Sequence, residues 1–319
     1  MGGTRFLGLE VVRQLLDAGH EVTVFHRGSR HPWWEAHVTT ITGDRTVPDD
    51  LRRLAEVRPD AVLDLSAYTS AQTEILLDAL GDAPRWVHVS TLNVYQPQQV
   101  LPWVEAMPYG PYPFWGNYAV EKIGCERALR TQRTQRTVSL RFPLVLGPGN
   151  FLPREEFVLN RLLDRATILL SGDGQAVHQY VWIEHAAHAL VAALELDVDG
   201  FAAFNVASRR CMTSLEGFVG VCAEVSGTVP DVRRVGGGAT GNDREQFDNA
   251  NCVFPFSNEN TFADLSAADA AGLLSPYMSL HEMIRAALEH LQENPERRRW
   301  TRTEAERAAM GRIGIQDAG

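Results

Sequence analysis

Short apolar runs alternate with amphipathic segments along the first half of the chain. Apolar residues three or four positions apart predict helices, and short runs of β-branched and aromatic residues predict strands. The first helix is expected over residues 9–18, where Val12, Leu15 and Leu16 share one face and Gly19 ends the pattern. Strands are expected at 21–25, 39–42, 61–65, 86–89 and 137–142. This alternation predicts a doubly wound parallel α/β sheet with helices on both faces.

A glycine-rich loop precedes the first predicted helix. Residues 2–8 read GGTRFLG and lead directly into that helix. Glycines let the backbone turn tightly there, and the free N–H groups of a helix N-terminus bind a pyrophosphate. Ordinary turns use the same residues, so the prediction of a nucleotide-binding loop depends on the helices and strands that follow it in order.

Tyr118 and Lys122 form a YxxxK motif on another predicted helix. A spacing of four places both side chains on one face of that helix. Hydride transfer to a carbonyl leaves an alkoxide that must take a proton as it forms. A tyrosine suits this task when an ammonium lies beside it, because the positive charge lowers the pKa of a phenol. The motif also occurs by chance in helices, so it needs a companion elsewhere in the chain.

The composition is that of a globular protein and argues against a nucleic-acid-binding or membrane protein. The 319 residues are 45% hydrophobic and can bury a substantial core. The net charge is −10, whereas a nucleic-acid-binding protein normally carries a basic patch. No apolar run approaches the ~20 residues that span a bilayer, and no basic stretch followed by an apolar segment opens the chain. We therefore expect a cytoplasmic protein with its 4 cysteines as free thiols.

These segments resemble the extended short-chain dehydrogenase/reductase superfamily, also called the NAD-dependent epimerase/dehydratase family. The GGTRFLG segment resembles the family's GxxGxxG loop, with Gly2 and Gly8 at its outer positions and Arg5 at the middle one. This departure resembles an atypical subgroup with a GGTRF loop, which includes plastid stem-loop RNA-binding proteins as well as reductases. The resemblance extends from Gly2 to the predicted helix at 280–291.

The resemblance also supplies the companion of the YxxxK motif. Residues 90–95, STLNVY, resemble the family's S-(S/T)-x-x-V-Y segment, which places Thr91 at the catalytic Ser/Thr position with Ser90 as the alternative. The resemblance then implies that Tyr118 is the acid–base group, that Thr91 polarises the substrate oxygen, and that Lys122 tunes Tyr118 and holds the nicotinamide ribose.

The cofactor preference depends on the end of the second predicted strand. Family members that prefer NAD place an acidic residue there for the ribose hydroxyls, whereas this chain has Arg27. A charge-assisted hydrogen bond contributes about 1.5–3 kcal/mol, so NADP(H) is favoured, and NAD(H) stays open. Asp44 matches an adenine-contacting position, although it is equally suited to a turn. The expected cofactor-binding residues are Gly2, Arg5, Phe6, Leu7, Gly8, Arg27, Asp44, Ser66, Ala67, Lys122 and Phe142.

Departures from the family pattern limit the substrate. The dehydratases of the family carry an acidic pair after the catalytic Thr, but this chain has Leu92 and Asn93 there, which argues against 4,6-dehydration. The arginine that often contacts a nucleotide diphosphate aligns with His178. Ser90, Trp115 and His178 are the candidate substrate contacts. A helical HxxH pair at 185–188 lacks the third ligand that a zinc site needs, so we assign no metal.

The sequence thus predicts an NADP(H)-dependent oxidoreductase that acts on a carbonyl or secondary alcohol of a small molecule. The alternatives are a sugar-nucleotide epimerase with bound NAD and a catalytically retired binding protein like the RNA-binding relatives. Neither nucleic acid nor a membrane is an expected partner, and a homodimer stays open. The expected lobes are a cofactor-binding Rossmann lobe over 1–150 with 176–208 returning to it, a smaller C-terminal substrate lobe over 151–175 and 209–305, and a tail over 306–319.

One expected element has no residues to form it. In this family a strand of roughly five or six apolar residues precedes the glycine-rich loop at the centre of the sheet. Here Met1 directly precedes Gly2, so the first strand of the expected sheet is missing. Unpaired ladder groups would cost about 1–3 kcal/mol each if buried. We expect a start inside a longer natural chain in preference to a rearranged sheet.

Overall fold

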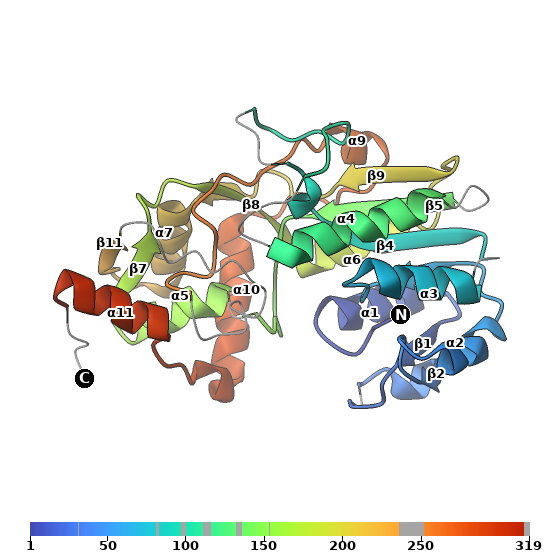
Figure 1. The fold of residues 1–319 in the computed structure, drawn as a ribbon. Helices are drawn as coiled ribbons and strands as arrows, with labels where there is room; N and C mark the ends of the chain where they lie inside the picture. Colours follow the sequence, from blue (N-terminus) through green and yellow to red (C-terminus); the bar gives the residue numbers. More distant parts are fainter. Residues whose placement is uncertain are drawn as a thin grey trace.

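The computed structural model describes residues 1–30, 32–80, 83–96, 100–110, 116–131, 136–152, 154–235 and 252–315. Figure 1 shows two lobes, with the N-terminal half of the chain in one and most of the C-terminal half in the other. None of the described helices is long and apolar enough to cross a membrane.

A parallel four-stranded sheet forms the centre of the first lobe. Its strand order is β3-β4-β5-β9, and the chain comes back to this lobe to add its last strand. The bounds are β3 (Val62–Asp64), β4 (Arg85–Thr91), β5 (Arg136–Phe142) and β9 (Phe201–Asn205). The parallel sheet confirms the predicted fold class. Of the segment 176–208 that was expected to return to this lobe, β9 pairs with β5, whereas β8 (Val177–Trp182) pairs with strands outside this sheet.

Helices cover both faces of this sheet (Figure 1). One face carries α1 (Leu7–Asp17) and α6 (Ile183–Ala192), whose apolar positions pack on Val87, Val138 and Leu140. The other face carries α3 (Ser70–Leu80) and α4 (Gly116–Thr131). Helix α1 presents one apolar stripe to the sheet, as the spacing of its apolar residues predicts, whereas α4 also buries the polar residues Lys122 and Glu126.

The sheet is divided where the first strand was expected. A two-stranded parallel sheet of β1 (Thr23–His26) and β2 (Thr39–Thr42) stands apart from the larger one. Met1 and Gly2 lie between the two, because Met1 bonds with Leu63 and Leu65 while the Gly2 amide donates to Phe25 O at 3.3 Å. The described residues contain no strand at this position, as expected. The 3-10 turn η1 (Glu35–His37) and helix α2 (Pro48–Ala55) flank β2.

The second lobe contains two small sheets and a group of helices. One sheet has the order β10-β8-β6 and the other pairs β11 with β7. The strands are β6 (Leu144–Leu146), β7 (Ile168–Ser171), β8 (Val177–Trp182), β10 (Met212–Ser214) and β11 (Val232–Val235). The helices are α5 (Arg154–Leu163), α7 (Leu215–Ser226) and α10 (Leu280–Glu293). The short helix α9 (Ser266–Ala270) lies instead against β9 of the first lobe, whose core includes Ala268 (Figure 1).

The segment expected to be a tail is part of the second lobe. Helix α11 (Glu304–Ile313) follows the 3-10 turn η4 (Pro295–Arg298) and starts with a capping box between Thr303 and Glu306. Ala309 and Met310 are buried against Leu169 and Val235. The few apolar residues of α11 are interspersed with charged residues, and for this reason the sequence alone predicted a tail.

Candidate functional site

The glycine-rich loop has the close packing that a dinucleotide needs. Gly2 and Gly3 have φ values of 94° and 97°, a region that favours glycine. A Cβ on Gly8 would lie 2.7 Å from the Gly3 Cα, so the start of α1 can approach the loop only with glycine there. The loop ends at the α1 N-terminus, whose positive dipole end suits a phosphate, although the Gly8 and Leu9 amides already donate to the carbonyls of Arg5 and Phe6. These residues therefore fit a dinucleotide.

The Trp34 side chain hydrogen-bonds to this glycine-rich loop. Its side chain is fully buried, and its Nε1 donates to the Gly3 carbonyl at 2.9 Å. The His26 ring packs edge-on against it at 5.9 Å between centroids. No role was predicted for Trp34, because nothing in the chain around it points to a partner 31 residues away.

The residues at the middle of the loop contact the second lobe. The Arg5 guanidinium lies 3.8 Å above the Phe151 ring, and Phe6 meets the same ring edge-on at 6.2 Å. Leu7 packs against both large apolar clusters of the molecule. Arg5 therefore links the glycine-rich loop to the segment that precedes α5.

The structure brings the three predicted catalytic residues to adjacent elements. Thr91 ends β4, and Tyr118 and Lys122 lie one turn apart on α4. The Lys122 ammonium is buried and donates to the carbonyl of Ala67 at 2.8 Å and to that of Val89 at 2.6 Å. Lys122 thus fixes α4 to the carboxyl ends of β3 and β4. Ligands of open parallel sheets bind at this edge.

The Thr91 hydroxyl keeps its proton available to a substrate. Its Oγ1 accepts the Asn93 N–H at 3.2 Å and so caps the 3-10 turn η2 (Leu92–Val94). A hydroxyl has one donor and two acceptor sites, and this cap uses one acceptor site only. Thr91 can therefore donate a hydrogen bond to an oxygen held in front of it.

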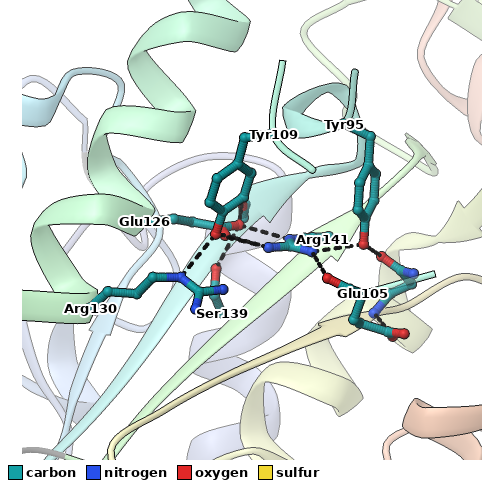
Figure 2. A network of polar contacts seen from close by, with 9 residues as sticks. Tyr95, Glu105, Tyr109, Glu126, Arg130, Ser139 and Arg141 are labelled. Atoms are coloured by element: carbon teal, nitrogen blue, oxygen red, sulfur yellow. Dashed lines mark hydrogen bonds and ion pairs between the residues drawn. The ribbon is translucent and has the colours of Figure 1, made fainter. Parts of the chain in front are cut away.

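The Ser90 side chain belongs to a buried polar network and does not point in the same direction as that of Thr91. Its hydroxyl donates to Glu126 at 2.5 Å, and the same carboxylate forms a two-pronged ion pair with Arg141. Figure 2 shows Arg141 between Glu126 and the Tyr95 hydroxyl, with Tyr109 completing the network. Burial would raise the pKa of Glu126, but Arg141 holds that pKa at about 2.

The predicted ribose and adenine contacts lie after β1 and β2. Arg27 is exposed, and it lies close enough to Asp44 to lower the pKa of that carboxyl. Hydrogen bonds from the Thr46 amide and hydroxyl lower that pKa more strongly. Asp44 thus forms a turn with Thr46, which is the second of the two roles that its position allowed.

Arg45 is a feature of this region that the motifs did not predict. Its guanidinium forms a two-pronged ion pair with buried Asp64 at 2.8 Å for both oxygens and also donates to Ser66 Oγ at 2.9 Å. Arg45 holds the pKa of Asp64 well below its usual range, against the effect of burial. It therefore connects the end of β2 with the Ser66–Ala67 segment after β3.

Three other residues were expected to contact the cofactor or the substrate, namely Phe142, His178 and Trp115. The Phe142 side chain is buried in the core beneath α1 and α6, so contact with a cofactor would fall to its backbone. His178 on β8 is buried, with its Nε2 2.8 Å from the Ser257 carbonyl, and burial lowers its pKa to about 4. Trp115 lies outside the described residues. The described residues form no group of three His, Cys, Asp or Glu side chains that could hold a metal.

The model of one protein family matches most of this chain. The model of the NAD dependent epimerase/dehydratase family matches residues 1–207. The chain belongs to that family. The matched part includes the glycine-rich loop, Thr91, Tyr118 and Lys122, together with the whole parallel sheet.

Two relatives with different names are similar in sequence to this chain. A chloroplast stem-loop binding protein of 41 kDa from Arabidopsis thaliana is 25% identical over 283 residues, which are 84% of this chain and 72% of the relative. The 2'-dehydrokanamycin reductase of Streptomyces kanamyceticus is 29% identical over 209 residues, which are 64% of this chain and 52% of the reductase.

Solved structures of the family share the fold. A UDP-glucose 4-epimerase from Thermotoga maritima has a TM-score of 0.75 at 19% identity, covering 92% of this chain and 98% of its own. A dTDP-glucose 4,6-dehydratase from Bacillus anthracis, in complex with NAD, has a TM-score of 0.76 at 15% identity, with 92% and 96% covered. At such identities the likeness concerns the fold.

Proposed function

We propose that this protein is an NADP(H)-dependent oxidoreductase that transfers a hydride at a carbonyl or secondary alcohol carbon of a small molecule. The observation that carries the proposal is the bond from the Lys122 ammonium to the Val89 carbonyl, two residues before Thr91. This bond places the helix that bears Tyr118 beside the end of the strand that bears Thr91. The chain belongs to the NAD dependent epimerase/dehydratase family, and the motif resemblance described above implies catalytic roles for the same three residues.

Each of the three residues has a distinct role in this proposal. When bound, the nicotinamide would supply or accept the hydride. Thr91 donates a hydrogen bond to the reacting oxygen, and Tyr118 gives that oxygen its proton or takes it back. Lys122 keeps α4 in place and puts a positive charge beside the phenol, which favours proton transfer near neutral pH.

The preference for NADP(H) is supported by charge at the ribose end of the site. The segment that follows β1 has Arg27 where an acidic residue would serve NAD. Arg27 is exposed, so its guanidinium is accessible to a 2'-phosphate. Arg5 offers a second exposed cation in the glycine-rich loop.

Two other functions remain as alternatives to be tested. An epimerase would use the same residues with a tightly held NAD, and the fold is shared with UDP-glucose 4-epimerases. A retired binding protein is suggested by the likeness to the chloroplast stem-loop binding protein. The presence of Thr91, Tyr118 and Lys122 favours catalysis, and the net charge of −10 disfavours RNA as a ligand.

A substrate screen with NADPH and NADH in parallel tests the reaction class. Candidate carbonyl compounds and alcohols are added to the purified protein, and the absorbance of the reduced nicotinamide is followed. An oxidoreductase consumes or forms one reduced nicotinamide for each product. Interconversion of two sugar nucleotides without net change in absorbance would support the epimerase instead, and RNA binding without turnover would support the retired protein.

Exchange of Arg27 for aspartate tests the cofactor preference. Arg27→Asp puts a negative charge beside the 2'-phosphate, so affinity for NADPH should fall at least ~10-fold more than affinity for NADH. Titration of both cofactors against both proteins measures this ratio. Arg233→Asp on β11 is the matched control, because it makes the same charge change on an exposed residue of the other lobe. An unchanged NADPH/NADH ratio in Arg27→Asp would contradict the assignment.

A further inference from the structure

Arg154 differs from the other strongly buried arginines. Arg141 and Arg161 are each paired with a buried glutamate through two nitrogens, and Arg45 pairs in the same way with Asp64. Arg154 is 9% exposed, its Nε has no hydrogen-bond partner, and it forms no ion pair within the described part of the chain. A buried charge without a partner is costly, so proteins rarely keep one without a use.

Within the described part of the chain, Glu155 attracts the Arg154 guanidinium electrostatically but forms no ion pair with it. Its neighbour Glu155 directs Oε1 to the Gly147 amide at 2.8 Å, and burial raises the pKa of Glu155 to about 7. His178 has a lowered pKa and is therefore neutral at pH 7. Burial lowers the pKa of Arg154 itself to about 10, which leaves the guanidinium charged at neutral pH.

Arg154 lies where the two lobes meet at the proposed catalytic group. It is the first residue of α5, and the Tyr118 phenol is close enough to affect its charge. Three residues earlier, Phe151 packs on Arg5 and Phe6 of the glycine-rich loop. The start of α5 also adds the partial positive charge of a helix N-terminus. Arg154 is thus a fixed cation beside the site of the reaction.

We propose that Arg154 binds an oxyanion of the small-molecule substrate, either a carboxylate or a phosphate, and so positions the substrate against Tyr118. The assignment of this anion to the substrate rests on the proposed function. A planar guanidinium binds either group through two parallel hydrogen bonds, which would fix the orientation of the substrate as well as its place.

Calorimetric titration of the protein with small anions tests this site without turnover. The probes are inorganic phosphate, acetate and neutral acetamide, each titrated with and without saturating NADP+. The wild type should bind phosphate or acetate and not acetamide, and Arg154→Gln should weaken that binding at least ~10-fold. Phosphate and acetate separate the two sources of the oxyanion. Arg233→Gln, which removes an exposed cation, should bind like the wild type.

Melting temperatures of Arg154→Met and Arg154→Lys provide a second measurement. Without anion, Arg154→Met should melt at or above the wild type, because it removes an unpaired buried charge. Phosphate stabilises many proteins nonspecifically. The quantity to compare is therefore the rise in melting temperature that phosphate causes, which should be larger for the wild type and Arg154→Lys than for Arg154→Met.

Several results would overturn the proposal. In the titration, no anion binding by the wild type, or equal binding by Arg154→Gln, would contradict it. A melting temperature of Arg154→Met far below that of the wild type would also contradict it. If Arg154→Gln lost affinity for NADP+ alone, Arg154 would be assigned to the cofactor. If the protein binds anions through Arg154 but reduces no carbonyl compound, the proposed function fails and the anion site stands.

Discussion

At the scale of single residues, Tyr118 is the group on which the proposed chemistry depends. Tyr118→Phe removes only the hydroxyl, so we expect turnover to fall at least ~10²-fold, the usual contribution of a general acid–base group. Affinity for NADPH should stay nearly unchanged, because the ring and Lys122 are retained. Steady-state kinetics and cofactor titration measure both quantities. Tyr277→Phe, which removes the hydroxyl of an exposed tyrosine far along the chain, is the matched control, and wild-type turnover in Tyr118→Phe would exclude the mechanism.

The buried carboxyl of Glu155 makes the free energy of unfolding depend on pH between 4.5 and about 7. Burial raises its pKa from 4.5 to about 7 in the folded protein. The folded state therefore holds a proton that the unfolded state has lost, and the stability from this group is complete below pH 4.5 and is lost as the pH rises to 7. The loss is on the order of 3 kcal/mol.

Replacement of Glu155 by glutamine isolates this effect. Glu155→Gln should remove the decrease in the free energy of unfolding between pH 4.5 and 7, since an amide does not titrate. Urea unfolding at several pH values gives the comparison. Glu156→Gln, which alters the next carboxylate along α5, should keep the decrease. A slope that persists unchanged in Glu155→Gln would mean that Glu155 is ionised in the folded protein.

The sequence indicated residues that belong to short motifs and missed residues whose partners are distant. Thr91, Tyr118 and Lys122 were found because their spacing is local. Arg45 and Asp64 are 19 positions apart, and neither lies in a recognisable pattern. Arg154 was missed for another reason, since its importance comes from the lack of a partner, and a sequence does not show which charges are buried.

At the scale of elements, α4 is held by the same face that carries its proposed catalytic residues. Tyr118, Lys122 and Glu126 follow one another at intervals of four, so they share a face of the helix. Lys122 bonds to carbonyls after β3 and on β4, and Glu126 bonds to Arg141 on β5. The position of Tyr118 thus depends on contacts with three strands.

Removal of the Glu126 charge tests this anchor. Glu126→Gln leaves Arg141 buried without its counter-charge, so we expect a loss of about 3–5 kcal/mol in the free energy of unfolding. Asp49→Asn breaks the exposed Arg52–Asp49 pair and should cost at most about 1 kcal/mol. Urea unfolding compares the two variants. A similar small loss in both would show that the network of Figure 2 is not a major source of stability.

The strands predicted in the first lobe lie where the structure has them, within two residues at either end. Strand β2 has the expected bounds, whereas β4 runs from Arg85 to Thr91 and exceeds the expected 86–89. The extra residues include Ser90 and Thr91, whose polar side chains interrupt the apolar pattern although their backbone continues the ladder. Polar residues with functional or network roles thus conceal the ends of strands.

At the scale of the whole molecule, one apolar core joins the two lobes. The largest cluster of buried residues includes Phe6, Ala119 and Ile123 from the cofactor-binding side and Met283 and Ile284 from α10. Strand–helix alternation predicted the first lobe, but the second lobe is assembled from segments distant in sequence, with short strands and no repeating pattern. Its organisation could not be predicted in detail for that reason.

The shared core predicts that both lobes unfold together. In the second lobe Arg161 is buried between Glu306 of α11 and the rings of Phe157 and Trp300. Glu306→Gln leaves the Arg161 charge unpaired, so we expect a loss of about 3–5 kcal/mol in the free energy of unfolding. Although the cause lies in one lobe, tryptophan fluorescence and far-UV circular dichroism should report a single shifted transition.

A second substitution on the same helix provides the control for this test. Glu304→Gln alters an exposed carboxylate in the first turn of α11 and should change stability by less than about 1 kcal/mol. The double variant Arg161→Met with Glu306→Leu should recover part of the loss, because it removes the buried pair, while the bonds of Glu306 to Arg302 and to the Thr303 amide remain lost. Two separated transitions in Glu306→Gln, with the cofactor-binding lobe unfolding at the wild-type urea concentration, would contradict a common core. In that case the contacts of Phe6 and Ile123 with the second lobe would be too weak to couple the unfolding of the two lobes.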